Sequence, residues 1–457
     1  DTYYKFFKAL LICLSIVLIY MIKCFRNKNK CFFHEYIYRG ENHLNIGLLG
    51  FGTIGTGVYE LINLNKGRFA KNLDEKVVIT KILDKDPNKK VAEEDKVARV
   101  VTNPDDIMDD PDIEIVIALL GGMDFEYGLI KRALQSGKHV VTANKAVISE
   151  YFEELLTIAA ENNVILRYEA SVGGGIPIIG SLKEELKINR VNEIKGILNG
   201  TTNFILSKMT EEGADFADTL KLAQSIGFAE ADPTADIEGY DVSRKLAILS
   251  SLAYGGIIKD EDVRKRGLSD VRAVDIEMAG DYGYIIKYLG HSVLKEGNQV
   301  YTTVEPVMFK EASIMSNVNS EFNIISIVGD IIGELQFYGK GAGKDATANA
   351  VVGDALYIIN CIKDNNFPKP LVFRKQLDKK GVGAFKGKYY LRVDIDSHET
   401  FEHALNAVDE VCARKNIIVS DNRVFFMTEP VEADVFDAMV AKIKEKQSEC
   451  FYARIYE

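Results

Sequence analysis

The sequence lacks an excess of positive charge. Lys and Arg number 56 against 67 Asp and Glu, which gives a net charge of −11 at neutral pH. A protein that binds nucleic acid needs a basic face for the phosphate backbone. We therefore expect no nucleic acid among the partners of this chain.

Cysteine is scarce and confined to the two ends of the chain. None of the six lies between residues 32 and 360, and no spacing resembles a zinc site. The central body is thus not built on disulfides, which is typical of a cytoplasmic protein.

Histidine is also scarce, with six residues and none between 140 and 290, where the polar motifs gather. A dehydrogenase that relies on a histidine base is therefore disfavoured. Any proton transfer there has to use lysine and carboxylate side chains.

A long hydrophobic run is missing as well. The apolar segment Ala9–Ile22 is shorter than the roughly 20 residues of a spanning helix, and no small-residue cleavage site follows it. We expect residues 1–43 to be translated upstream sequence, with Leu44 as the start. The alternative is a short membrane anchor, because Lys8 and Lys23 flank the run.

A glycine turn opens the main body, whose length predicts two or three domains. An apolar strand from Leu44 leads into the turn, and a helical pattern follows it. The glycines permit a tight turn, close approach of a pyrophosphate and packing of helix on strand. A glycine turn without ligand is the alternative, and the strand–turn–helix context disfavours it. The predicted cofactor residues are Gly50, Phe51, Gly52, Thr53, Ile54 and Gly55.

The second strand, Val77–Leu83, ends at Asp84, Lys85 and Asp86. An acid here would bind the ribose hydroxyls of NAD, whereas a lysine favours the 2′-phosphate of NADP. Both cofactors stay open, with Lys85 favouring NADP.

Strands and helices keep alternating up to residue 173, which predicts an α/β, Rossmann-type doubly wound parallel sheet over 44–173. Lys145 follows the strand at 139–144, at the edge where such sheets bind ligands. A solvated surface lysine is the alternative. The glycine turn and helix in 336–362 are expected to rejoin this domain beside the cofactor.

The remaining chain predicts two further units. Residues 174–335 read as an α+β domain for substrate binding and dimerisation, and 363–386 read as a linker. Residues 387–457 have the pattern of a small βαββαβ unit, with helices at 400–414 and 433–446.

Five carboxylates crowd the stretch from Gly227 to Leu246, followed by one lysine, Lys245. By itself this pattern fits a helix start, with Asp241 and Lys245 as an ordinary surface ion pair four residues apart. The five acids are Glu230, Asp232, Asp236, Glu238 and Asp241.

The motifs together resemble homoserine dehydrogenase. "GFGTIGTGV", "VVTANKA", "EASVGGGIPII", "GILNGTTNFIL", "GFAEADPTADIEGYDVSRKLAILSSLA" and "FYGKGAG" occur in the order of that family, from Leu44 to about Cys361. The resemblance implies NAD(P)-dependent interconversion of homoserine and aspartate semialdehyde, in threonine, methionine and isoleucine biosynthesis. It also implies a homodimer or homotetramer.

The same resemblance implies roles for single residues. Lys245 is the expected proton donor and acceptor, and Lys145 is expected beside the nicotinamide and the substrate. Phe228 stands where many members have tyrosine. The expected substrate-binding acids are Glu230, Asp241 and Asp236; Gly227 and Gly343 are expected near the cofactor; Glu169, Val172, Gly174 and Ile176 are expected to bind sodium, mainly through backbone oxygen.

The C-terminal unit resembles an ACT domain, the regulatory module of many members. The usual glycine turn after its first strand is replaced by "DSHETFEHAL", so the resemblance does not predict feedback control by threonine.

A dinucleotide-binding regulator that has lost catalysis is the alternative to an enzyme. The presence of Lys145, Lys245, Glu230 and Asp241 argues against that alternative.

Overall fold

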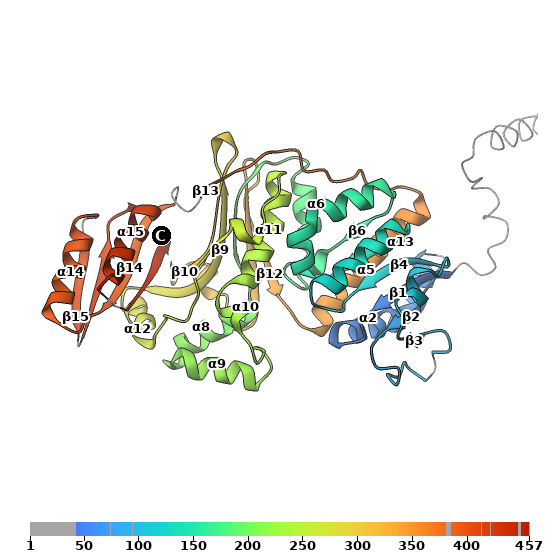
Figure 1. Cartoon of the computed structure of the whole chain (residues 1–457), viewed down its shortest axis with the longest axis horizontal. Coiled ribbons are helices and arrows are strands. Elements are labelled where there is room, and N and C mark those ends of the chain that lie inside the picture. Colours follow the sequence, from blue (N-terminus) through green and yellow to red (C-terminus); the bar gives the residue numbers. More distant parts are fainter. Residues whose placement is uncertain are drawn as a thin grey trace, which may run out of the picture.

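The computed structural model describes residues 43–456, apart from 74, 94, 381–384, 413, 421 and 447–448. The apolar segment Ala9–Ile22 and the two interpretations of it lie outside the described residues. A parallel sheet with its helices lies at one end of the molecule, a larger mixed sheet occupies the middle, and the C-terminal unit lies at the other end (Figure 1). No helix within the described range has the length and apolar character needed to cross a bilayer.

The first sheet has six strands, all parallel, in the order β3-β2-β1-β4-β5-β6. The order reverses between β1 and β4, which is where doubly wound sheets bind ligands. The predicted Rossmann-type sheet is confirmed. Its strands are β1 (His43–Leu49), β2 (Lys76–Leu83), β3 (Arg99–Val101), β4 (Ile113–Ala118), β5 (His139–Thr142) and β6 (Leu166–Arg167).

Helices cover both faces of this sheet, which explains why its strands are apolar throughout. On one face, Ile46 and Leu48 of β1 share a core with Val58 of α2 and Val351 of α13. The other face packs against α5 and α6. The helices are α2 (Thr53–Leu64), α3 (Lys66–Leu73), α4 (Asp105–Met108), α5 (Asp124–Gln135), α6 (Lys145–Glu161) and α13 (Lys344–Asp364).

Helix α13 returns to the first sheet from far along the chain. It packs on α2 so closely that a Cβ on Gly57 would lie 2.9 Å from the Lys344 side chain and 3.2 Å from Ala348 Cβ. This contact brings the glycine-rich loop before α13 beside the glycine turn before α2.

The middle sheet is mixed and largely antiparallel, and its strands run β12-β11-β7-β9-β10. Long β9 and β10 form a hairpin that pairs along its whole length. The strands are β7 (Val191–Ile197), β9 (Tyr284–Leu294), β10 (Gln299–Lys310), β11 (Phe322–Gly329) and β12 (Gly333–Lys340), with short β8 (Arg264–Lys265) and β13 (Asp378–Lys380) beside β10.

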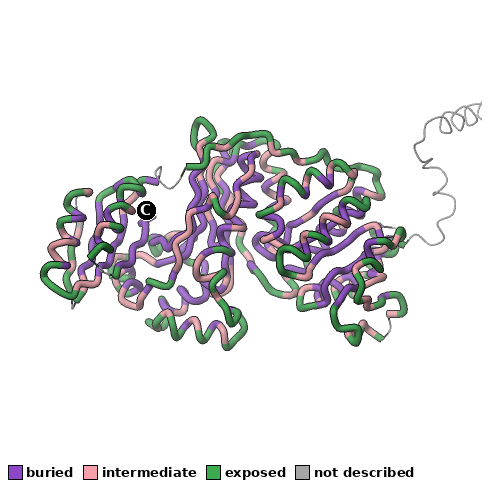
Figure 2. The backbone as a smooth tube through the Cα atoms, viewed as in Figure 1, coloured by how far each residue is buried: buried purple, intermediate pink, exposed green. Residues whose placement is uncertain are grey.

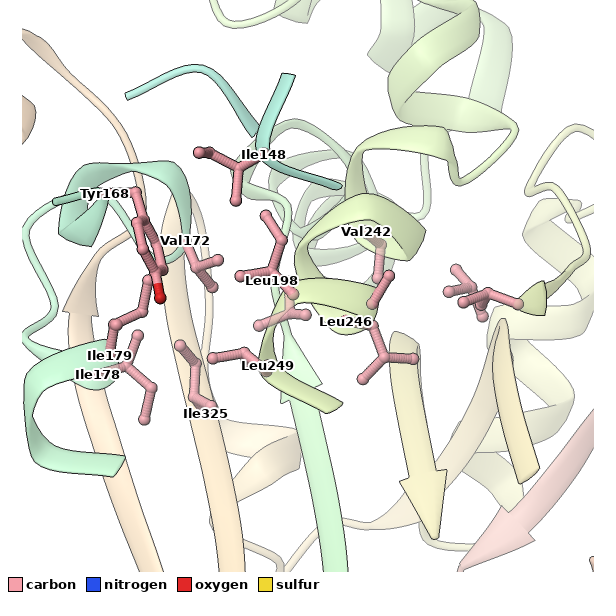
Figure 3. Close-up of a cluster of buried hydrophobic side chains, with 14 of the residues drawn as sticks. Ile148, Tyr168, Val172, Ile178, Ile179, Leu198, Val242, Leu246, Leu249 and Ile325 are labelled. Carbon is pink, nitrogen blue, oxygen red and sulfur yellow. The ribbon is translucent and has the colours of Figure 1, made fainter. Parts of the chain in front are cut away.

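The helices of the middle region include one that is almost entirely buried, α11 (Tyr240–Tyr254). Val242 and Leu246 of α11 pack in one hydrophobic core with Ile148 of α6 and with Leu198 (Figure 3). Lys245 is therefore carried into the protein interior by its own helix. The other helices are α7 (Ile178–Glu185), α8 (Gly200–Glu212), α9 (Phe216–Ser225), α10 (Thr234–Ile237) and α12 (Ala273–Asp281).

The C-terminal unit continues the middle sheet, because β18 pairs in parallel with β10. Figure 2 shows buried backbone running from the middle sheet into this unit. Helix α14 ends at Asp409 and not near 414, because β15 begins at Arg414 and pairs with β16. The elements are β14 (Lys386–Asp394), α14 (His398–Asp409), β15 (Arg414–Ser420), β16 (Arg423–Thr428), β17 (Val431–Glu432), α15 (Ala433–Lys444) and β18 (Cys450–Tyr456).

Candidate functional site

A cleft of about 710 Å³ opens between the first sheet and the middle region. One side is formed by Ile54 of the glycine turn and Lys145 at the start of α6. The other side is formed by the starts of α8 and α11, and the loop before α13 closes one end. A cavity of this size accommodates a small molecule together with part of a cofactor.

The glycine turn between β1 and α2 depends on the absence of side chains. Gly50 has φ +99°, and a Cβ there would lie 2.6 Å from the Leu119 carbonyl oxygen. A Cβ on Gly55 would lie 2.0 Å from the Gly50 oxygen. At Gly52, the N-cap of α2, a Cβ would meet nothing within 4 Å. The turn thus leaves open space at a helix N-terminus, which fits the pyrophosphate of a dinucleotide.

Asp84, at the end of β2, already accepts hydrogen bonds from other groups of the protein. Asp84 is 8% exposed and accepts hydrogen bonds from Phe51 N (3.2 Å), Asp86 N (3.0 Å) and Lys89 Nζ (2.8 Å). Burial alone would raise the pKa of Asp84, but Lys89 and the two N–H groups hold it below its usual value. Lys89 also donates to the Phe51 carbonyl at 2.6 Å, whereas Lys85 is exposed. Lys89 is not among the cofactor residues predicted from the sequence, although it lies in the same loop.

Lys145 reaches into the cleft from the start of α6. Asn144 caps that helix, and its side-chain oxygen accepts from Ala146 N and Val147 N, both at 3.1 Å. The Lys145 ammonium lies 3.0 Å from Asp241 Oδ1, and this carboxylate raises the pKa of Lys145. The side chain is 40% exposed but ion-paired, so it is not simply a solvated surface lysine.

Lys245 lies deeper, with its side chain 10% exposed. Its Nζ donates to Asp241 Oδ2 at 2.6 Å and to the Leu198 carbonyl at 2.7 Å. The sequence could not decide whether burial or the neighbouring acids dominate. In the structure, burial lowers the pKa of Lys245 more than Asp241 raises it.

Asp241 links the two lysines, with one carboxylate oxygen on each. Burial would raise its pKa, but Lys245 and Lys145 hold the pKa of Asp241 well below its usual range. Asn199 Nδ2 joins this carboxylate to a second one, at 2.8 Å from Asp241 and 2.7 Å from Asp236. Burial and the nearby Asp241 raise the pKa of Asp236. The centre thus contains two lysine amino groups and two carboxyl groups.

The other acids of the carboxylate-rich stretch are directed elsewhere. Glu230 is exposed and is not among the residues that line the cleft. Glu238 accepts from Ser269 Oγ at 3.0 Å, and Asp232 accepts from Thr234 Oγ1 at 2.6 Å. Phe228 lines the cleft and packs edge-on against Phe204.

The turn at residues 169–176 has no carboxylate available for a metal. Glu169 is buried, and its side chain accepts from Ile179 N (2.7 Å) and Gly180 N (2.8 Å) at the start of α7. Gly174 has φ +54°, and a Cβ there would lie 2.5 Å from the Gly341 carbonyl. Within the described residues, no group of three or more His, Cys, Asp or Glu side chains could hold a metal. A cation here would depend on main-chain oxygens, such as those of Val172, Gly174 and Ile176.

Two further acids border the site and were missed from the sequence. Glu126 is fully buried at the carboxyl end of the first sheet, where it accepts from Gly121 N at 2.6 Å and Thr142 Oγ1 at 3.1 Å. Burial raises the pKa of Glu126. Glu321 lines the cleft beside Gly200. No sequence signal distinguishes either residue from an ordinary surface acid.

Comparison with known families agrees with this arrangement. The family model "Homoserine dehydrogenase, NAD binding domain" matches residues 50–169, and the model "Homoserine dehydrogenase" matches residues 177–356. The homoserine dehydrogenase of Synechocystis is 43% identical over 331 residues, which cover 71% of this chain and 75% of that protein.

Solved structures extend the similarity over most of the chain. The crystal structure of a homoserine dehydrogenase from Thiobacillus denitrificans superposes with a TM-score of 0.83 at 33% identity, covering 92% of this chain and 100% of that one. A hyperthermophilic archaeal homoserine dehydrogenase in complex with NADPH gives a TM-score of 0.59 at 26% identity, covering 72% of this chain and 99% of that one.

Proposed function

The chain belongs to the homoserine dehydrogenase family, and from this membership we propose how its own residues divide the reaction. The protein is an NAD(P)-dependent oxidoreductase that interconverts homoserine and aspartate semialdehyde. When bound, a nicotinamide cofactor would supply the acceptor or donor of the hydride. The protein must therefore bind both molecules and move the hydroxyl proton.

We propose that Lys245 accepts this proton during homoserine oxidation and returns it during reduction. A general base must reach the reacting oxygen and be neutral when it acts. Burial lowers the pKa of Lys245, which favours the neutral amine, while Asp241 and the Leu198 carbonyl fix its Nζ. The observation that carries the proposal is the Lys245–Asp241–Lys145 arrangement in a cleft that also includes Ile54 of the glycine turn.

The substrate has an ammonium and a carboxylate to bind. We assign the ammonium to Asp236, because Asp241 is already paired with two lysines. The carboxylate is assigned to the start of α8, where the N–H groups of Gly200 and Thr201 have no partner within the helix. Lys145 then orients the reacting end of the substrate. Glu230 stays a proposed substrate-binding residue that would have to turn inward.

For the cofactor, the segment Gly50–Gly55 is proposed to hold the pyrophosphate, with Gly227 and Gly343 near the nicotinamide in the shared cleft. We propose a preference for NADP over NAD. Lys89 occupies the acid at the end of β2, so Asp84 is not free for ribose hydroxyls, and both Lys89 and Lys85 provide positive charge for a 2′-phosphate.

The NADP preference is tested by two variants. Lys89→Ala is expected to raise the KM for NADP and lower that for NAD, because Asp84 becomes free. Lys85→Ala is the matched variant and is expected to raise only the KM for NADP. An unchanged NADP-to-NAD ratio of kcat/KM in both variants would show that neither lysine sets the preference.

A sodium ion is proposed at the main-chain oxygens of Glu169, Val172, Gly174 and Ile176. Carbonyl oxygens suit a hard cation, and the positive φ of Gly174 turns the chain sharply here. Asn323, buried close to Gly341, has a side-chain amide without a partner, which leaves polar atoms near this turn to be satisfied. The melting temperature in sodium chloride should exceed that in choline chloride at equal ionic strength; equal values would contradict the site.

A homodimer or homotetramer in the cytoplasm is also proposed. Strand β12 lies at the edge of the middle sheet, and Tyr338, Ile331 and Ile332 on or beside it are exposed. Exposed apolar edges of this kind mark association surfaces. Sedimentation velocity tests the assembly.

The proposed domains are 44–173 with 336–362, 174–335 and 387–457. Limited proteolysis tests them, because cleavage is expected within the linker at residues 363–386.

The decisive experiment uses purified residues 44–457. Homoserine-dependent reduction of NADP and of NAD is measured with and without threonine. Activity is expected with at least one cofactor. Binding of NADP without any turnover would instead support the inactive regulatory protein.

A further inference from the structure

The turn at residues 318–322 forms part of the cleft wall and touches the start of α8. Glu321 of this turn and Gly200 of α8 both line the cleft. A Cβ on Gly200 would lie 2.9 Å from the Glu321 carbonyl oxygen. The turn and the helix therefore approach so closely that only glycine fits, and a small displacement of either would reshape this wall.

Asn203 ties the turn to α8 from behind the cleft. It is fully buried, and its Nδ2 lies 3.0 Å from each of three carbonyl oxygens, those of Val318, Ser320 and Phe322. The turn needs such support, because Ser320 has φ +60°, a region that non-glycine residues rarely adopt. Ser207, also on α8, accepts from Ser320 N at 3.0 Å.

Lys287 adds a third anchor from β9. It is 1% exposed, and its Nζ donates to Val318 O at 2.7 Å and to Asn319 Oδ1 at 3.0 Å, with Asn203 Oδ1 at 3.5 Å. These partners are all neutral oxygens. Burying an ammonium group among neutral acceptors costs stability. Lys287 is therefore not explained by a stabilising ion pair. Two of its contacts are on the 318–322 turn, and the third is on Asn203 of α8, which holds the same turn.

Asn203, Ser207 and Lys287 hold helix α8 and the 318–322 turn together, and each of these two elements brings polar groups to the cleft. Asn203 lies one helical turn after Asn199, whose side chain bridges Asp236 and Asp241. Glu321 is held by Ser320 Oγ at 2.7 Å, and this hydrogen bond lowers the pKa of Glu321. Glu321 is thus a charged acid on the cleft wall.

We propose that Lys287 and Asn203 are positioning residues for substrate binding, which hold the 318–322 turn against α8 and so present the Glu321 carboxylate to the ammonium group of the substrate. The inference rests on the proposed function, because it takes homoserine as the ligand. It adds one acid to the substrate site and explains why a lysine and an asparagine are buried behind it.

The first test is kinetic. Lys287→Met is expected to raise the KM for homoserine about tenfold, comparable to losing one hydrogen bond to a charged group. The KM for NADP should stay close to that of the parent protein. Lys208→Met is the matched control, because Lys208 lies on α8 but is paired with Glu212 at the surface, and it should change nothing.

The second test asks whether the effect passes through Glu321. Glu321→Gln alone should also raise the KM for homoserine, and adding Lys287→Met to it should raise KM less than twofold further. Equal effects of Lys287→Met in both backgrounds, or a normal KM in Glu321→Gln, would overturn the proposal. If Lys287→Met folds poorly, Ser207→Ala carries the same test, because it removes the acceptor for Ser320 N.

The outcome is separable from that of the proposed function. Failure of the catalytic assignment would appear as normal kcat in Lys245→Ala. The role of Lys287 is tested by the KM for homoserine and by whether the effect of Lys287→Met on KM depends on Glu321. Both can be measured whichever group accepts the proton.

Discussion

The two sides of the cleft are built in different ways. The side proposed for the nucleotide is one contiguous segment, Gly50–Gly55, whose geometry is set by the lack of side chains. The side proposed for the substrate gathers Asn199, Asp241, Lys245 and Glu321 from distant parts of the chain. The first is a backbone site, and the second is a network of charged and polar side chains. Substitutions on the two sides should therefore change different properties: the KM for NADP or the melting temperature on one side, and kcat or the KM for homoserine on the other.

The largest effect is expected for Lys245→Ala. Removing a general base costs about 10²–10⁴-fold in rate, so kcat should fall by this range. NADPH binding, measured by fluorescence titration, should survive because Lys245 contacts Asp241 and Leu198 and not the glycine turn. Near-normal kcat would refute the assigned role.

The nucleotide side should show a split between two glycines. Gly52→Ala is expected to keep the fold, since its Cβ meets nothing within 4 Å, but to raise the KM for NADP by about tenfold through contact with the pyrophosphate. Gly55→Ala should lower the melting temperature, because its Cβ would lie 2.0 Å from Gly50 O. Equal melting temperatures for the two variants would contradict this account.

The substrate side should show a split between two acids of the same stretch. Asp236→Asn is expected to raise the KM for homoserine about five- to tenfold, as for the loss of a charged hydrogen bond. Glu238→Gln is the matched variant and should leave KM unchanged, because Glu238 contacts Ser269 outside the cleft. Steady-state kinetics at saturating NADP measures both, and a KM increase in Glu238→Gln alone would reverse the assignment.

A pH dependence of stability is expected from Lys287. Burial lowers the pKa of Lys287 from its ordinary 10.5 to about 8. Between these values the unfolded chain holds a proton that the folded protein lacks. The free energy of unfolding should therefore rise with pH across this window, and the cost of the buried charge is fully present below about pH 8.

Urea unfolding at pH 7.5, 8.5 and 9.5 measures this contribution as the difference between the parent protein and Lys287→Met. The parent should gain stability relative to the variant as pH rises. Lys208→Met should show no such trend, because Glu212 raises the pKa of Lys208 and the group stays protonated in both states. A constant difference for Lys287→Met would show that its pKa is not depressed.

Much of the fold was accessible from local patterns. Glycine spacing and apolar strands predicted the parallel sheet and the turn before α2. The four-residue spacing of Asp241 and Lys245 predicted their contact, because a helix brings these positions together. In the C-terminal unit the helix predicted at 400–414 runs from His398 to Asp409, and the helix predicted at 433–446 ends at Lys444.

The sequence by itself determined the features that depend on neighbours along the chain. These are the glycine turn, the doubly wound type of the parallel sheet and the Asp241–Lys245 pair. Only the tertiary structure decided that Lys145 meets Asp241, that Lys89 rather than Lys85 contacts Asp84, and that Glu230 faces solvent while Glu321 lines the cleft. It also decided that burial outweighs the acids at Lys245. The physical reason is that backbone geometry and helical periodicity act over a few residues, whereas desolvation and charge pairing depend on which distant segments pack together.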